Sequence, residues 1–251
     1  MRPMMGRLQN FKPTFGPPLI MTNAGMLATR LLRGAGVDAP AFNAVLLQHG
    51  AVVAGSFALE IAAQLLNGPS AQPADVDVWV PQDDCDAFLR QIAAILPLHE
   101  LSASAPSSYP ILATRFQCDV AGLRTFVPKS NAPTGALPVQ VMCCRKSVWW
   151  TVGSFDLTVS QVVWTGRDLM LAPKTAKDVR LGRLRLNRKA LHRQSPEEMG
   201  RTMRRVKKYE ARGYPLASTA PLHEAVEALM LPTSPRASAY DRRSHHLDVL
   251  K

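Results

Sequence analysis

The segment "ADVDVWV" (residues 74–80) places two carboxylates inside a run that otherwise reads as a buried strand. Successive side chains of a strand alternate between faces, so Asp75 and Asp77 share one face and Val76 and Val78 share the other. Two like charges on one face repel, and burying them costs free energy unless another group neutralises them. Mg²⁺ does this in proteins, where one or two carboxylates and substrate phosphates commonly hold it. The alternative interpretation is an edge strand with one solvated face.

The residues just upstream form a second pattern. "AVVAG" (51–55) is a short apolar run closed by glycine, which predicts a buried strand, and "SFALEIAAQLLNG" (56–68) follows directly as a helix. Gly55 allows the backbone to approach a ligand closely. Ser56 opens a helix whose N-terminal N–H groups attract phosphate. This order of elements predicts that phosphate and a metal ion meet here, while Glu60 on the helix is expected to be a surface acid.

The rest of the chain is β-rich in its middle and helical and basic towards its end. Predicted helices cover 23–36, 40–50, 83–96 and 195–214, and predicted strands cover 109–128, 137–144, 147–152 and 154–164. No GxGxxG or Walker A motif is present. We therefore predict an α+β fold, with a mixed-sheet palm and helices over 43–166. An N-terminal arm and helix (1–42) precede the palm, and a basic helical region and tail (167–251) follows it.

The positive charge of the chain is concentrated in one stretch. The net charge is +11, and residues 174–212 hold 14 basic and 4 acidic residues. A concentrated basic block is typical of a polyanion partner, either nucleic acid or nucleotide phosphates. The helix "SPEEMGRTMRRVKKYEARGY" (195–214) lies in this stretch, and its Arg204, Lys207 and Lys208 are candidates for contacts with phosphates. The alternative is a solvated basic surface that only aids solubility.

Cysteine usage and hydropathy indicate the cellular context. None of the four cysteines forms a CxxC motif, so we expect small core residues of a reduced protein, with Cys143 and Cys144 on opposite strand faces. There is no apolar run of 18 or more residues, and the N-terminus lacks the apolar region of a signal peptide. We therefore expect a cytoplasmic protein without a membrane partner.

The two motifs together resemble the DNA polymerase beta-like nucleotidyltransferase superfamily. The matching pieces are "VVAGS" (52–56) and "DVDVW" (75–79), and the resemblance covers about residues 50–165. It implies that Gly55 and Ser56 hold the triphosphate of an NTP, and that Asp75 and Asp77 hold Mg²⁺ or Mn²⁺. A second resemblance, to viral and fungal nucleotidyltransferase-like proteins, rests on "SFDLTVSQVVW" (154–164) and the helix at 195–214.

The superfamily also implies a third carboxylate on a later strand. We favour Asp156, which lies between Phe155 and Leu157 in "SFDLTVS", as a catalytic residue and metal ligand. Asp119 in "FQCDVAG" is the other acidic candidate. The strand "LPVQVMCC" carries Gln140 instead, and a glutamine at the third position would weaken metal binding.

Two functions follow from these patterns. The first is a metal-dependent nucleotidyltransferase that moves NMP from an NTP to RNA, a protein or a small molecule, with Arg204, Lys207 or Lys208 binding the triphosphate or the acceptor. The second is a catalytically degenerate module of the same fold that binds nucleic acid through residues 174–212.

Overall fold

The computed structural model describes residues 19–96, 98–100, 120–130, 132, 134–191, 194 and 196–224. Asp119 therefore lies outside the described residues. The strands are β1 (Leu19–Met21), β2 (Val52–Ala54), β3 (Val76–Pro81), β4 (Leu98–Glu100), β5 (Val120–Pro128), β6 (Val139–Cys144), β7 (Val163–Trp164) and β8 (Leu169–Leu171). The α-helices are α2 (Gly25–Gly34), α3 (Ala39–His49), α4 (Ser56–Leu66), α5 (Cys85–Ile95), α7 (Val148–Gly153), α8 (Pro173–Arg180), α9 (Arg188–Leu191) and α10 (Pro196–Glu210).

The strands form one mixed sheet in the order β1-β8-β7-β2-β3-β6-β5-β4. β3 pairs antiparallel with β2 and parallel with β6, so Asp77 in β3 lies near the centre of the sheet, and Asp75 lies in the bend just before β3. The predicted α+β fold with a mixed-sheet palm is thereby confirmed. The short strands β1 and β8, from outside residues 43–166, pair with each other in the same sheet. The proposed division at residues 42 and 166 stays a prediction.

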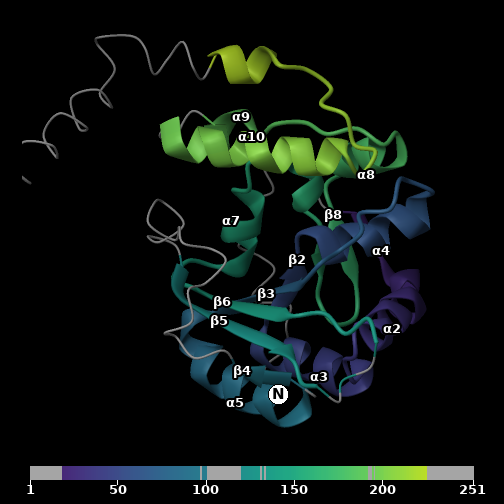
Figure 1. Cartoon of the computed structure of the whole chain (residues 1–251), viewed down its shortest axis with the longest axis vertical. Helices are drawn as coiled ribbons and strands as arrows, with labels where there is room; N and C mark the ends of the chain where they lie inside the picture. Colours follow the sequence, from purple (N-terminus) through teal and green to yellow (C-terminus); the bar gives the residue numbers. More distant parts are fainter. Residues whose placement is uncertain are drawn as a thin grey trace, which may run out of the picture.

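Helices cover both faces of the sheet (Figure 1). The larger core lies between the sheet and α2, α3, α4 and α5, and it contains Phe42, Phe57 and Phe88. A smaller core lies on the other face, where Trp79 and Met142 pack with residues of α7. Because Val76 and Val78 face the larger core, the alternation of β3 directs Asp77 and Trp79 to the opposite face.

The region 147–164 differs from the prediction of two strands. Residues 148–153 form the helix α7, with Ser147 as its N-cap accepting a hydrogen bond from the Trp150 N–H. Of the second predicted strand, only Val163–Trp164 joins the sheet, and Leu157 forms an isolated antiparallel bridge with Leu186. Asp156 lies in a bend just before a 3₁₀ turn at Thr158–Ser160. The β-branched and aromatic residues that favoured strands here pack in a short capped helix instead.

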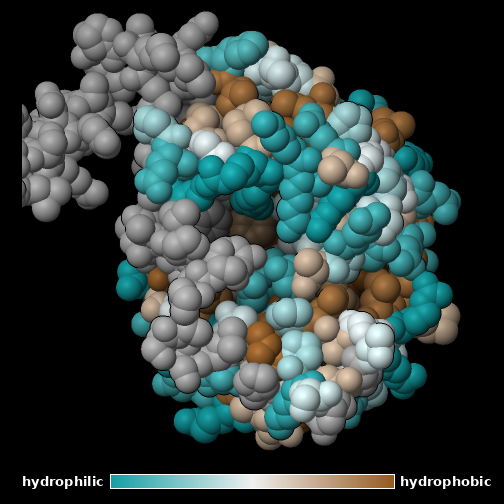
Figure 2. Space-filling view, viewed as in Figure 1, coloured by the Kyte–Doolittle hydropathy of each residue, from teal (hydrophilic) through white to brown (hydrophobic). Residues whose placement is uncertain are grey.

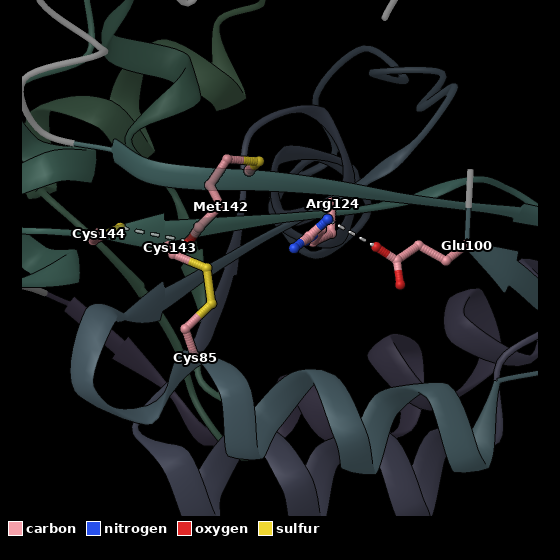
Figure 3. The surroundings of a disulfide bond; sticks show 6 residues. All are labelled: Cys85, Glu100, Arg124, Met142, Cys143 and Cys144. Atoms are coloured by element: carbon pink, nitrogen blue, oxygen red, sulfur yellow. Dashed lines mark hydrogen bonds and ion pairs between the residues drawn. A yellow bond between two sulfur atoms is a disulfide. The ribbon is translucent and has the colours of Figure 1, made fainter. Parts of the chain in front are cut away.

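The prediction that the cysteines are reduced was wrong for two of them. Cys85 at the start of α5 and Cys143 in β6 form a disulfide, with their Cα atoms 5.8 Å apart (Figure 3). Cys144 lies on the opposite strand face, as expected, where its thiol donates to the Met142 carbonyl at 3.8 Å. The spacing of the cysteines gave no indication of the pair, because α5 and β6 approach each other only in the folded chain.

The C-terminal helix α10 is amphipathic and packs on the palm (Figure 1). Its buried residues are Met199, Thr202, Val206 and Tyr209. In the part of the chain that the structure describes, no helix combines the length and the apolar character that a membrane span requires.

Candidate functional site

Gly55 and Asp77 are in close contact where β2 ends and β3 runs beside it. Ala54 lies opposite Asp77 in the antiparallel register, so the following residue, Gly55, turns beneath the aspartate. Gly55 has φ +75°, and a Cβ atom added to it would lie 2.8 Å from Asp77 Oδ2. A side chain at residue 55 would therefore both strain the backbone and displace the carboxylate. The glycine that the sequence suggests for close approach to a ligand also makes room for Asp77.

Ser56 is the first residue of α4 and is buried. The backbone N–H groups of the first helical turn have no partner within the helix, and the helix dipole adds positive potential there. The N-terminus of α4 begins directly beside the carboxylate of Asp77. This places a phosphate-attracting helix end next to an acidic group, as the order of the sequence motifs predicts.

Asp75, in the bend just before β3, contacts Gln140 on the neighbouring strand β6. Gln140 lies opposite Asp77 in the parallel register of β3 and β6. Its Nε2 donates to Asp75 Oδ2 at 3.5 Å, which is a long hydrogen bond. Asp75, Asp77 and the amide of Gln140 therefore gather on one face at the centre of the sheet. Gln140 occupies the position beside the aspartate pair.

The surroundings of Asp77 disfavour its charge. Burial, followed by the neighbouring charge of Asp75, raises the pKa of Asp77 from its usual value of 3.8 to about 7. Arg205 and Lys208 on α10 act in the opposite direction and lower that pKa. Positive charge placed beside Asp77 lowers the pKa of its carboxyl group, so a bound cation would favour the ionised form.

α10 lies over this side of the sheet. Of the three α10 residues predicted to bind phosphate, Arg204, Lys207 and Lys208, only Lys208 is among the charges that lower the pKa of Asp77. Lys208, which was predicted, and Arg205, which was not, both influence the aspartate electrostatically. Arg204 and Lys207 are exposed on α10. Figure 2 shows a hollow in the molecular surface next to hydrophilic residues on the α10 side. The spacing of Arg201, Arg205 and Lys208 along one helical face was the signal that could have found Arg205.

Asp156 has different partners from those expected of a third metal ligand. Its Oδ1 lies 2.6 Å from Arg205 Nη1, and its Oδ2 accepts a hydrogen bond of 2.6 Å from Thr202 Oγ1. Asp156 is also buried. Within the described residues, no three His, Cys, Asp or Glu side chains form a group that could hold a metal ion. The structure thus connects Asp156 to α10, and it does not bring Asp156 into a metal-binding group with Asp75 and Asp77.

Glu60 is buried, so its expected place on the surface was wrong. Its carboxylate accepts hydrogen bonds from Gln64 Nε2 at 2.6 Å, Ser70 Oγ at 2.9 Å and the Ala71 N–H at 2.6 Å. Ser70 and Ala71 belong to the loop that leads to Asp75. Glu60 therefore fixes the path of the backbone that delivers the first aspartate.

The donor set at this site fits one magnesium or manganese ion. Both metals prefer oxygen ligands, and Mg²⁺ is commonly bound by one or two carboxylates together with substrate phosphates. Asp75 and Asp77 supply the carboxylates, and the N-terminus of α4 can attract phosphates. The arrangement is thus suited to binding a polyphosphate whose charge is shared between a cation and the basic residues of α10.

Comparison with known proteins identifies the fold of the chain. No protein-family model and no curated protein sequence matches the chain. The solved structures that it resembles include a CCA-adding enzyme in complex with CTP, with a TM-score of 0.55 and 12% identity over 84% of this chain. An apo form of a CCA-adding enzyme gives a TM-score of 0.52 and 14% identity over 80% of the chain. The chain spans only 46% and 45% of the length of these two enzymes. It therefore shares the nucleotidyltransferase fold of CCA-adding enzymes.

Proposed function

We propose that this chain is a nucleotidyltransferase that transfers the nucleoside monophosphate of an NTP to an acceptor hydroxyl. The observation that carries this proposal is the contact between Gly55 and Asp77, which joins a helix N-terminus to a pair of carboxylates in the centre of the sheet. The fold shared with nucleotidyltransferases supports it. It also agrees with the resemblance of "VVAGS" and "DVDVW" to the polymerase beta-like superfamily.

In this proposal Asp75 and Asp77 hold one Mg²⁺ or Mn²⁺ ion, and the backbone at Gly55 and Ser56 receives the triphosphate. Such an ion supplies charge neutralisation on the phosphate oxygens. Arg205 and Lys208 carry further positive charge to the same side of the sheet, and their influence on Asp77 supports this assignment. Arg204 and Lys207 are exposed on α10 and are available to the acceptor or to the triphosphate.

The transfer itself needs positioning and charge neutralisation more than covalent chemistry from the protein. The acceptor oxygen attacks the α-phosphorus and forms a new O–P bond. The bond between the α-phosphorus and the oxygen that bridges it to the β-phosphate breaks, and pyrophosphate leaves with the electron pair. The acceptor hydroxyl proton passes to solvent. The helix end at Ser56 and the α10 cations stabilise the charge that collects on the leaving pyrophosphate.

The basic stretch favours a nucleic acid as the acceptor. The exposed cations of α8, α9 and α10 are Lys174, Lys177, Arg180, Arg188, Lys189, Arg204, Lys207 and Lys208. Exposed lysines and arginines bind a phosphate backbone with strong dependence on salt. We therefore place an RNA-like acceptor along α10, with its reacting hydroxyl directed towards Asp75 and Asp77.

The experiment that tests the function measures transfer of label from each α-³²P-labelled NTP, with Mg²⁺ or Mn²⁺, to pooled RNA and to the protein itself. We expect label with the wild type and none with Asp75→Asn or Asp77→Asn. Asp83→Asn removes an exposed carboxylate outside the site and serves as the matched control, which should keep wild-type transfer. Equal labelling by the wild type and Asp77→Asn would contradict the proposal.

A binding module without catalysis is the second candidate, and the position of Gln140 favours it. A neutral amide stands beside the aspartate pair where a further carboxylate would strengthen cation binding. Binding of RNA that falls steeply with salt, but does not depend on NTP or on divalent metal, would favour this module. Arg204→Ala with Lys207→Ala should weaken that binding, whereas Arg90→Ala, an exposed residue on α5, should not.

A further inference from the structure

The residue opposite Asp77 on β6 is the neutral Gln140. Gln140 is 8% exposed and lies in register with Asp77, so its amide has little freedom to leave the site. The same amide is 3.5 Å from Asp75 Oδ2. The two carboxylates therefore share their strand face with a neutral group that donates a hydrogen bond to one of them.

Asp156, the further carboxylate that we favour from the sequence, is already engaged. Both oxygens of Asp156 are directed to α10, one to Arg205 Nη1 at 2.6 Å and the other to Thr202 Oγ1 at 2.6 Å. A new cation at Asp156 would have to replace this ion pair. Among the described side chains, no three of His, Cys, Asp or Glu form a group that could hold a metal ion.

Two divalent cations held close together repel each other about four times as strongly as two unit charges at the same distance. A site for two ions in the nucleotide complex needs enough negative charge, from carboxylates in addition to the triphosphate, to offset that repulsion. Asp75 and Asp77 supply two negative charges, and Gln140 adds none. The α10 cations on the same side of the sheet repel each bound metal ion as well.

We propose that Gln140 makes the Asp75–Asp77 pair a site for one divalent cation in the nucleotide complex, where a carboxylate at residue 140 would admit a second. This inference rests on the proposed function, because it concerns the same nucleotide site. It identifies Gln140 as a positioning residue: its amide holds Asp75 towards the shared ion and sets the number of ions bound. The chain thus binds its NTP with a single ion.

The test is equilibrium dialysis of the full chain against Mn²⁺ and a nucleoside triphosphate analogue with a methylene group between the α- and β-phosphorus atoms, which cannot be transferred. Retained analogue and retained Mn²⁺ are measured separately. We expect one Mn²⁺ per retained analogue for the wild type and two for Gln140→Glu, which changes charge with little change in size. Gln140→Met should keep one ion. Gln82→Glu, which adds a carboxylate at an exposed residue, is the matched control and should also keep one.

Two Mn²⁺ ions per analogue in the wild type would overturn the inference while leaving the proposed function intact. One ion in both the wild type and a folded Gln140→Glu variant would also overturn it, because residue 140 would then not set the number of ions. If the wild type retains no analogue, the proposed function fails and the inference fails with it. Thermal unfolding of each variant establishes that it is folded, and the wild-type ion count tests the proposal without any variant.

Discussion

Asp156 ties the basic helix α10 to the palm through Arg205, whose Nη1 atom lies 2.6 Å from Asp156 Oδ1. The aspartate is buried, whereas the arginine side chain is 36% exposed, so the pair is only partly screened by water. Thr202 donates to the second oxygen of the same carboxylate. One side chain from the bend before β7 therefore fixes the rotation of α10 about its axis, and with it the side from which Arg205 and Lys208 approach Asp77.

Replacing Asp156 by alanine should loosen α10 from the palm. The change leaves Arg205 and Thr202 without their common partner, and we expect the free energy of unfolding to fall by about 1–3 kcal/mol. Urea unfolding of the wild type and the variant measures this change. Thr202→Val removes only one of the two contacts and should cost less. An Asp156→Ala variant with wild-type stability would contradict a structural role for this carboxylate.

Gly55→Ala should damage both stability and the candidate site. An alanine at φ +75° is strained, and its Cβ atom would lie 2.8 Å from Asp77 Oδ2. We expect a loss of about 1–3 kcal/mol in the free energy of unfolding. NTP binding should also weaken, because the Asp77 carboxylate must move. Gly25→Ala is the matched control, since a Cβ atom added there meets nothing within 4 Å. Equal effects of the two substitutions on Tm and on NTP binding would refute this view of Gly55.

The pH dependence of stability should reveal the environment of Asp77. Its pKa is raised from 3.8 to about 7, chiefly by burial and then by the charge of Asp75. Between these two values the folded state retains a proton that the unfolded state has lost. The contribution of protonated Asp77 to the free energy of unfolding is therefore fully present below pH 3.8, and it is lost as pH rises through about 7.

Asp77→Asn removes the ionisable group, and with it the loss of stability that accompanies its ionisation. Without divalent metal, the variant should gain Tm relative to the wild type as pH rises from about 5 to about 8. Added Mg²⁺ should raise the Tm of the wild type at the higher pH and leave Asp77→Asn nearly unchanged. Asp83→Asn controls for the loss of one exposed carboxylate. A Tm difference between Asp77→Asn and the wild type that is the same at both pH values would be evidence against a raised pKa.

The local part of the site could be predicted from the sequence because its residues are close along the chain. The strand at 52–54, the helix that starts at Ser56 and the strand at 76–81 each follow from short hydrophobic patterns. Antiparallel pairing of the two strands then places Asp77 opposite Ala54. The contact between Gly55 and Asp77 is a direct consequence of that short connection.

The long-range part could not be predicted, because it depends on which distant segments pair. Gln140 reaches Asp77 only through the parallel register of β3 and β6, and neither strand carries a local signal for that register. Asp156 was interpreted as a strand residue facing the metal because β-branched and aromatic residues surround it. The structure instead places it in a bend, where Arg205 on α10 approaches it. Tertiary packing overrides strand propensity in this segment.

The disulfide between Cys85 and Cys143 should persist in the purified protein. Peptide mapping after alkylation without a reductant should recover these two residues as a linked pair, and reduction should separate them. Replacing both by serine should lower the free energy of unfolding by about 2–4 kcal/mol. Reductant should lower the free energy of unfolding of the wild type and leave that of the double-serine variant unchanged, so the variant is the control for the addition of reductant. Recovery of Cys85 and Cys143 as alkylated thiols without reduction would contradict the bond.

Glu60 should control metal binding without touching the metal. Its carboxylate accepts from Ser70 and from the Ala71 N–H, which lie in the loop before Asp75. Together with Gln64, these make three donors to the Glu60 carboxylate, and Glu60→Gln replaces one accepting oxygen with an NH₂ group that donates. We therefore expect a loss of about 1–3 kcal/mol in stability.

The Mn²⁺ affinity of Glu60→Gln in the presence of nucleotide should fall by about 10–100-fold, as for other groups that orient a metal ligand. Glu197→Gln makes the same chemical change at an exposed residue of α10 and should leave both quantities unchanged. Glu60→Asp keeps the charge and should recover part of the Mn²⁺ affinity. If Glu60→Gln lowers stability but leaves Mn²⁺ affinity intact, the carboxylate supports the fold alone, and the loop before Asp75 holds its position by other contacts. One of these is the hydrogen bond of 2.5 Å that Tyr214 donates to the Pro69 carbonyl.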